Sequence, residues 1–267
     1  MMYMVNATQP ASTDGFSATV PTAEGLTAGT YYVWYYVKAD DSHTDSEISA
    51  SGIEVTIASA YTMAAAATSA DKGKLICTDG HIHAYGEDAE CTKDRVALIC
   101  YVGNDAETST TYNHGLALAL ADVSETKKWC NQTGENCLGA GRQFSSTDDA
   151  KTDMAGIDNT DVLAGSLSHN HDAAIAARNY NSGTYPDGTS AWFLPSVGQW
   201  DKMIGTGGYG LTNLKTDANG YTGLQENVYC SSTESNASNA WVFLSSSGNL
   251  DGSSKDNNRR VRACLAF

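Results

Sequence analysis

The sequence predicts an α+β protein with a small all-β domain at its N-terminus and a larger mixed domain after it. Residues 1–59 contain aromatic and β-branched runs of strand length, separated by turn signals. Residues 60–70 are rich in Ala, Ser and Thr, a composition typical of a linker. Residues 71–267 mix strand-like runs with segments that have helical residue preferences. We therefore expect two domains joined by a linker at residues 60–70.

The N-terminal domain is expected to act as a short stalk. Residues 31–37 read YYVWYYV, which suits a half-buried strand, and residues 53–57 alternate apolar and polar side chains as a closing strand does. The pattern AGTYYVWYYVKAD, followed by VTI, resembles the second half of a bacterial immunoglobulin-like repeat. Residues 1–59 are too few to form a complete seven-stranded sandwich. We therefore expect either a reduced version of this fold or part of a larger domain.

The larger domain opens with strand-like sequence. Residues 73–77 and 81–85 flank the turn signal Asp79-Gly80, and this order predicts a β-hairpin. Residues 96–103 are apolar almost throughout, which predicts a strand buried in the interior of a sheet.

Helical patterns follow these strands. Residues 114–122, HGLALALAD, consist mostly of helix formers and predict a buried helix. Residues 172–180 predict a second helix, with Asp172 placed to suit the positive end of the helix dipole. A third, short helix is expected after Ser196, which is a suitable N-cap residue.

The charge balance excludes some classes of partner. The chain has 31 acidic and 16 basic residues and a formal net charge of -15. A surface this acidic repels phosphate backbones and anionic lipids, so we expect no nucleic-acid partner. The sequence has no apolar run long enough to span a bilayer, so we expect no membrane insertion.

Four motifs in the larger domain point to a family when taken in order. They are HGLALALAD at 114–122, WFLPSVGQWDKMI at 192–204, YCSSTE at 229–234 and RVRACLAF at 260–267. In this order they resemble the C-type-lectin-like domains, of the formylglycine-generating-enzyme type, found in the target proteins of diversity-generating retroelements. The resemblance covers residues 71–267 and is to the type found in gut Bacteroides-like bacteria and their phages.

The resemblance implies a non-enzymatic protein that binds a ligand or receptor. Such a protein is displayed on a bacterial surface or a phage particle, and its partner is an unknown protein or cell-surface ligand. In this family the final strands carry a variable region, here about residues 229–267, that retroelement mutagenesis rewrites. A stable fold elsewhere in the domain lets this surface change.

The residues of this segment divide into a binding face and a scaffold. The expected binding face comprises Cys230, Ser235, Ser238, Val242, Leu244, Ser246, Asn249, Asp251, Ser253, Ser254 and Asp256. The expected scaffold comprises Tyr229, Trp241, Phe243, Val261, Ala263 and Leu265. Ser, Asn and Asp offer adaptable hydrogen bonding, as they do in antibody loops.

The composition of the segment agrees with adenine-directed mutagenesis. Replacing the adenines of AAY codons gives NNY codons, which cannot encode Lys, Glu, Gln, Met or Trp. Between Val242 and Asn258 only Lys255 belongs to this excluded set. A Ser-, Asn- and Gly-rich loop of an ordinary surface hairpin would have a similar composition.

Residues 240–244 allow two interpretations. Because side chains alternate across a strand, Trp241 and Phe243 share one face, and Val242 and Leu244 share the other. The polar flanking loop favours Val242 and Leu244 pointing outward as a small apolar patch. The alternative is a central strand buried on both faces.

Two pairs of histidines raise the question of a metal site, which we do not expect. His81 and His83, and likewise His169 and His171, are spaced to share one face of a strand, and Asp172 adds a carboxylate. Both histidine pairs flank turns, and no third metal-binding residue lies at a spacing typical of metal sites. We expect no metal and no other cofactor, with His169 and His171 hydrogen-bonding locally before the helix. Calcium is not expected because EPN-, QPD- and WND-like motifs are absent.

The seven cysteines are an odd number, so at least one is unpaired within the chain. Cys130 and Cys137 could bridge a local loop, and most of the others resemble small buried hydrophobes. Formylglycine-generating enzymes share the overall fold and use reactive cysteines, and Cys230 and Cys264 lie in a comparable region. The nearby arginines at 259–262 are expected to be solvated or at a strand edge. Since no enzyme motif matches, we expect no enzyme; a cysteine oxidase and a plain structural domain remain the alternatives.

Overall fold

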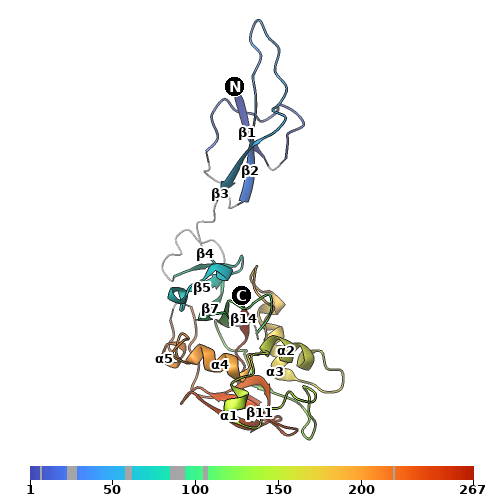
Figure 1. Ribbon diagram of the computed structural model, residues 1–267, viewed down its shortest axis with the longest axis vertical. Helices are drawn as coiled ribbons and strands as arrows, with labels where there is room; N and C mark the ends of the chain where they lie inside the picture. Colours follow the sequence, from blue (N-terminus) through green and yellow to red (C-terminus); the bar gives the residue numbers. More distant parts are fainter. Residues whose placement is uncertain (7, 23–28, 58–61, 85–93, 105–107, 219) are drawn as a thin grey trace. The chain divides into compact units, whose positions relative to one another are not determined.

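In the computed structural model the chain forms two compact units, Met1–Tyr61 and Thr62–Phe267 (Figure 1). The structure describes all residues except 7, 23–28, 58–61, 85–93, 105–107 and 219. The described residues form a mixed fold, mostly sheet with several short helices, which agrees with the predicted α+β class.

The smaller unit contains a three-stranded antiparallel sheet in the order β1-β2-β3. Its strands are β1 (Met2–Asn6), β2 (Gly29–Tyr36) and β3 (Ile53–Ile57). The aromatic run predicted to be a strand is β2, whose alternate residues Trp34 and Tyr36 are buried. The ring of Phe16 packs edge-on against Tyr36 at 5.1 Å between centroids. Alternation along β2 therefore supplies the core of this unit.

The larger unit has a six-stranded antiparallel sheet in the order β14-β8-β7-β5-β6-β4. Its strands are β4 (Thr62–Met63), β5 (Leu75–Cys77), β6 (His81–His83), β7 (Arg95–Val102), β8 (Gly115–Ala119) and β14 (Cys264–Ala266). The hairpin predicted around Asp79-Gly80 is β5–β6, and the buried strand predicted at 96–103 is β7. The part of that hairpin prediction beyond Ala84 lies outside the described residues.

The helix predicted at residues 114–122 is wrong. Gly115–Ala119 forms β8, which lies between β7 and β14 with every residue buried. A short apolar run buried on both faces has no alternation, so its pattern does not separate a strand from a buried helix.

The expected linker at 60–70 is also corrected, because Thr62 onward belongs to the larger unit. Strand β4 pairs with β6, and two 3₁₀ helices follow, η1 (Ala64–Ala66) and η2 (Ser69–Asp71). The side chains of Ala64 and Ala67 are only 2% exposed and pack in the core. The alanines of this segment suggested a flexible linker, but Ala64 and Ala67 pack closely against core residues of the larger unit.

The helices of the larger unit are short. They are α1 (Thr147–Ala150), α2 (Gly156–Ala164), α3 (Asp172–Arg178), η4 (Tyr180–Gly183), α4 (Val197–Ile204) and α5 (Leu211–Leu214). The helix predicted at 172–180 is confirmed as α3, with Asp172 in its first turn. Ser196 is the N-cap of α4, as predicted, and forms a capping box with Gln199.

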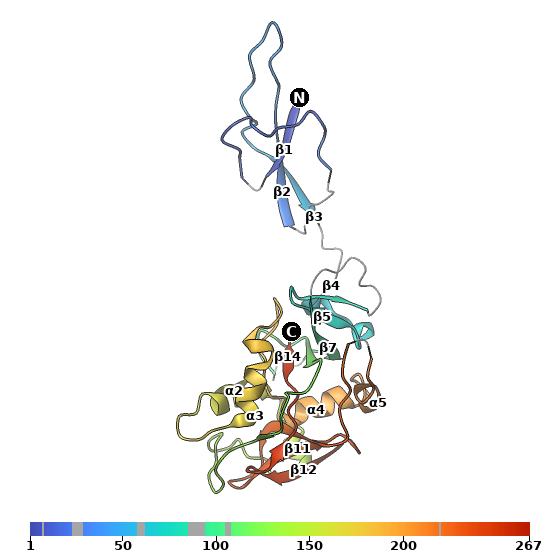
Figure 2. The same cartoon turned by 180° about the vertical axis from the view of Figure 1, so that it is seen from behind.

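A second, three-stranded antiparallel sheet follows in the order β10-β11-β12. Its strands are β10 (Val228–Glu234), β11 (Asn239–Leu244) and β12 (Asn249–Ser254), and a small pair joins β9 (Lys127–Lys128) to β13 (Asn258–Arg259). In Figures 1 and 2, α4 lies between the two sheets, and β11 and β12 lie at the end of the larger unit away from β4. Trp200 of α4 stacks on Phe243 of β11 at 4.7 Å between ring centroids.

Candidate binding surface on the C-terminal sheet

The exposed part of the C-terminal sheet follows its edge strand, β12, and the adjoining turns. Five residues of the expected binding face are exposed there, and we call them the β12 rim: Ser238, Ser246, Asn249, Asp251 and Asp256. Four others are half-buried: Ser235, Leu244, Ser253 and Ser254. The rim is polar and acidic, so it suits hydrogen bonding more than apolar contact.

The outward orientation expected for Val242 is wrong. Its side chain is only 4% exposed, and it stands between Cys230 of β10 and Asp251 of β12 in the sheet register. Cys230 is 1% exposed. Strand β11 is central and its middle residues are buried on both faces, which is the alternative interpretation. Cys230 and Val242 therefore do not belong to an exposed binding face.

The expected scaffold residues are buried. Their exposed fractions are 0% for Tyr229, Phe243, Val261, Ala263 and Leu265 and 7% for Trp241. The indole N–H of Trp241 donates to the carbonyl oxygen of Phe144 at 2.7 Å. These side chains hold the sheet on the body of the larger unit.

A buried ion pair lies beneath the rim. The ammonium of Lys255 donates to the carboxylate of Glu234 at 2.5 Å and to the carbonyl oxygen of Glu135 at 2.7 Å. Both paired side chains are 0% exposed. The Glu234 carboxylate also accepts the backbone N–H groups of Cys137 (2.7 Å) and Leu138 (3.2 Å). Burial raises the pKa of Glu234, but these hydrogen bonds and the ammonium outweigh it, so the pKa lies below its usual value.

Sequence reasoning missed this pair. Lys255 stood out only as a residue that NNY codons exclude, and Glu234 only as the end of a motif. The available signal was a lone Lys within a Ser-, Asn- and Asp-rich segment, since such a residue is more easily explained by a fixed partner than by variation.

A second buried charge fixes the C-terminal segment. Arg262, expected to be solvated or at a strand edge, is 0% exposed. Its Nε–H donates to a carboxylate oxygen of Asp122 at 2.6 Å, and Nη1 and Nη2 donate to the carbonyl oxygens of Ala119 (3.0 Å) and Thr222 (2.9 Å). The hydroxyl of Tyr229 donates to the other oxygen of Asp122 at 2.9 Å. The expectation failed because a run of arginines does not show which one faces the core.

The two cysteines of the enzyme alternative are buried in apolar surroundings. Burial raises the pKa of Cys230 to about 12 and that of Cys264 well above its usual value of 9.0. Only the thiolate is nucleophilic, so these surroundings hold both side chains in the unreactive form near neutral pH.

The histidines take up arrangements that differ from those expected. His81 and His83 lie close to Cys77, which is a third possible ligand that the sequence spacing did not reveal. His169 pairs through Nε2 with Glu135 at 2.8 Å, and Nδ1 of His171 lies 3.1 Å from the carbonyl oxygen of Trp129. The rings of His169 and His171 thus contact distant segments rather than hydrogen-bonding locally.

The described residues contain no helix that is both long enough and apolar enough to cross a membrane.

Comparison with known proteins gives one informative likeness. No protein-family model matches the sequence, and no curated protein matches it either. Among solved structures, the fold is similar to that of a fimbrial protein from Bacteroides ovatus ATCC 8483, with a TM-score of 0.52 and 15% sequence identity. The alignment covers 90% of this chain and 58% of that protein, so the chain spans little more than half of its length. At this identity the likeness shows a shared fold.

Proposed function

We propose that this chain is a non-enzymatic binding protein displayed on a bacterial surface, and that the β12 rim contacts its ligand. In this proposal the larger unit is a C-type-lectin-like head, the smaller unit is an immunoglobulin-like stalk, and retroelement mutagenesis rewrites the rim. The observation that carries the proposal is the separation of exposed polar residues from the buried groups that hold the sheet together.

Two acidic side chains of the rim form hydrogen bonds with residues one or two positions away in the chain. A carboxylate oxygen of Asp251 accepts the backbone N–H of Gly252 at 2.8 Å, and Asp256 accepts the hydroxyl of Ser254 at 2.5 Å. The sheet beneath is held by the stack of Trp200 on Phe243 and by the buried charges described above. Because the rim contributes little to packing, its side chains can change while the fold persists.

Surface display is supported by the structural neighbour, which is described as a fimbrial protein of a Bacteroides species. That likeness is to a bacterial protein, so we prefer a bacterial surface to a phage particle. The buried, protonated state of Cys230 and Cys264 supports a binding role over a cysteine oxidase.

The first test is genetic. Sequencing the locus should reveal a near-copy of the codons for residues 229–267 beside a reverse-transcriptase gene, with mismatches confined to template adenines. The mismatched codons should map to the rim. A locus without a template repeat would remove diversification from the proposal and leave a constant binding face or a plain structural domain to be tested.

The second test is on the protein. Replacing Ser246, Asn249 and Asp251 together with alanine should leave the midpoint of thermal unfolding nearly unchanged, because all three are exposed. Phe243→Ala is the matched control in the same sheet and should cost about 3–5 kcal/mol of unfolding free energy. Loss of cooperative unfolding in the triple variant would show that the rim is structural and not a replaceable binding face.

A further inference from the structure

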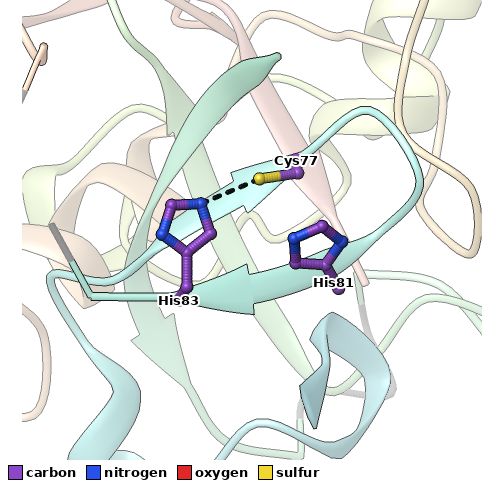
Figure 3. Close-up of side chains that lie close together, drawn as sticks. All are labelled: Cys77, His81 and His83. Atoms are coloured by element: carbon purple, nitrogen blue, oxygen red, sulfur yellow. Dashed lines mark hydrogen bonds between the residues drawn. The ribbon is translucent and has the colours of Figure 1, made fainter. Parts of the chain in front are cut away.

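Three side chains capable of binding a metal ion converge at the β5–β6 hairpin (Figure 3). The ligand atoms of Cys77, His81 and His83 all lie within 4.8 Å of one another. Their exposed fractions are 0%, 5% and 2%. Ile76 stands opposite Ile82, and continuing this register places Cys77 opposite His81, with His83 on the same face. Short-range backbone geometry alone therefore assembles the cluster.

The turn between the two strands is tightly constrained. The N–H of Gly80 donates to the carbonyl oxygen of Cys77 at 2.9 Å and closes the turn. Gly80 has a positive φ of 81°, and a Cβ at this position would lie 2.2 Å from the carbonyl oxygen of Asp187. Only glycine fits here, so the hairpin holds its side chains in a fixed arrangement.

The contacts of the two imidazoles resemble those of metal-binding histidines. Nδ1 of His81 pairs with the carboxylate of Asp79, and Nδ1 of His83 lies 3.0 Å from the carbonyl oxygen of Ala84. Acceptors at Nδ1 favour the tautomer in which Nε2 carries the lone pair. Nε2 of His83 lies 3.0 Å from the sulfur of Cys77. A carboxylate or carbonyl behind each ring is the usual outer-shell support of a zinc ligand.

We propose that Cys77, His81 and His83 bind one Zn²⁺ ion. One thiolate and two imidazoles form a borderline-soft ligand set that suits zinc and disfavours Mg²⁺ and Ca²⁺. The ligand atoms of a tetrahedral zinc site lie about 3.3–3.6 Å apart, so the Cys77 and His83 side chains need to separate by only a fraction of an ångström. Water or a further donor completes the fourth position.

A second cluster is a poorer candidate. Cys130, Cys137 and His171 also have ligand atoms within 4.8 Å of one another. However, the ammonium of Lys255 lies 3.8 Å from the sulfur of Cys137. The carboxylate nearest this cluster, that of Glu234, is already paired with this ammonium, whereas the carboxylate of Asp79 contacts a ligand histidine of the first cluster. This difference makes Cys137 a matched control residue.

The proposed site is structural and independent of ligand binding at the rim. Strands β5 and β6 lie in the six-stranded sheet, while β11 and β12 lie at the other end of the larger unit (Figures 1 and 2). Zinc would cross-link the two strands of the hairpin and stabilise the folded state by binding it preferentially.

The test uses the full chain, stripped with a chelator and titrated with Zn²⁺, and separately with Co²⁺ as a spectroscopic probe. We expect one tightly bound Zn²⁺ per chain, a rise in the unfolding midpoint, and thiolate-to-cobalt charge-transfer absorption. Cys77→Ser should abolish that absorption, and His83→Gln should prevent stoichiometric binding. Asp79→Asn, which alters only the outer shell, should weaken binding by about 10–100-fold. Cys137→Ser should bind as the unmodified chain does.

The unmodified chain alone can overturn the proposal, even if a variant fails to fold. Failure to bind Zn²⁺ stoichiometrically would show that Cys77 and His83 form only a hydrogen-bonded thiol–imidazole pair. Binding that survives Cys77→Ser but is lost in Cys137→Ser would place the ion at the other cluster and also contradict it.

Discussion

Lys255 and Glu234 form an ion pair in which both side chains are buried away from water. Removing two charges from water is costly, and the Coulombic attraction and surrounding hydrogen bonds offset that cost only while both partners are present. Loss of one partner therefore leaves a buried carboxylate or ammonium without compensation. A folded variant therefore needs to keep both Lys255 and Glu234.

Lys255→Met should reduce the free energy of unfolding by about 3–5 kcal/mol, because it leaves the Glu234 carboxylate buried without its cation. Urea denaturation followed by circular dichroism measures the loss. Lys215→Met is the control, since Lys215 pairs with the exposed Glu226 at 2.8 Å and its removal should change stability little. Equal effects of the two substitutions would show that Lys255 is not buried as described.

The same pair predicts a response to acid. The pKa of Glu234 in the folded state lies below the usual 4.5, so its carboxylate contributes stability in full above pH 4.5, and this contribution is lost as the pH falls further. Glu234→Gln should therefore flatten the fall in unfolding free energy between about pH 5 and about pH 3. Denaturant titrations over this range measure the slopes. Parallel pH profiles for the two proteins would refute the assignment.

At the level of single elements, predictability depended on local signals. Helix α4 was predictable because Ser196 and Gln199 form a capping box that is visible in the sequence. Strand β8 was not, because burial on both faces removes the alternation that identifies a strand. For the same reason the sequence suggested an outward Val242, although β11 is a central strand with neighbours on both sides. Neither the strand at β8 nor the burial of Val242 could be predicted without knowing the order of the strands in the sheets.

The α4 cap gives a prediction for one element. The hydroxyl of Ser196 accepts the N–H of Gln199 at 3.4 Å and donates to the carbonyl oxygen of Asp153 at 2.6 Å. Ser196→Ala should therefore cost about 1–2 kcal/mol of unfolding free energy. Ser146→Ala, at the exposed start of the four-residue α1, should cost less. A larger loss at Ser146 than at Ser196 would contradict this account of the cap.

At the scale of the whole molecule, composition predicted the division into two units and a boundary within residues 60–70, but not the extent of the linker. The Ala-rich segment suggested a linker, but Ala64 and Ala67 pack in the larger unit. The exposed rim was largely predictable from its polar sequence. The Cys77 cluster, the Lys255 pair and the Arg262 contacts were not, because each joins residues through the fold rather than through a recognisable spacing.

Each unit has its own sheet, which predicts independent folding of the larger one. A chain starting at Thr62 should unfold cooperatively with the same midpoint as the larger unit in the full chain. Calorimetry of both proteins, supported by amide spectra from nuclear magnetic resonance, measures this. A shortened chain that is unfolded or molten would show that residues 1–61 are needed for the fold.

The burial of Lys255 limits how large a repertoire the segment could yield. Every lysine codon begins with two adenines, so adenine-directed copying that ran through this position would replace the lysine in most daughter genes. Most of those daughters would lose the partner of Glu234 and be removed by misfolding before meeting any ligand. A productive process would have to leave the Lys255 codon unchanged, so this codon should match from one copy to the next while those of Asn249 and Asp251 vary.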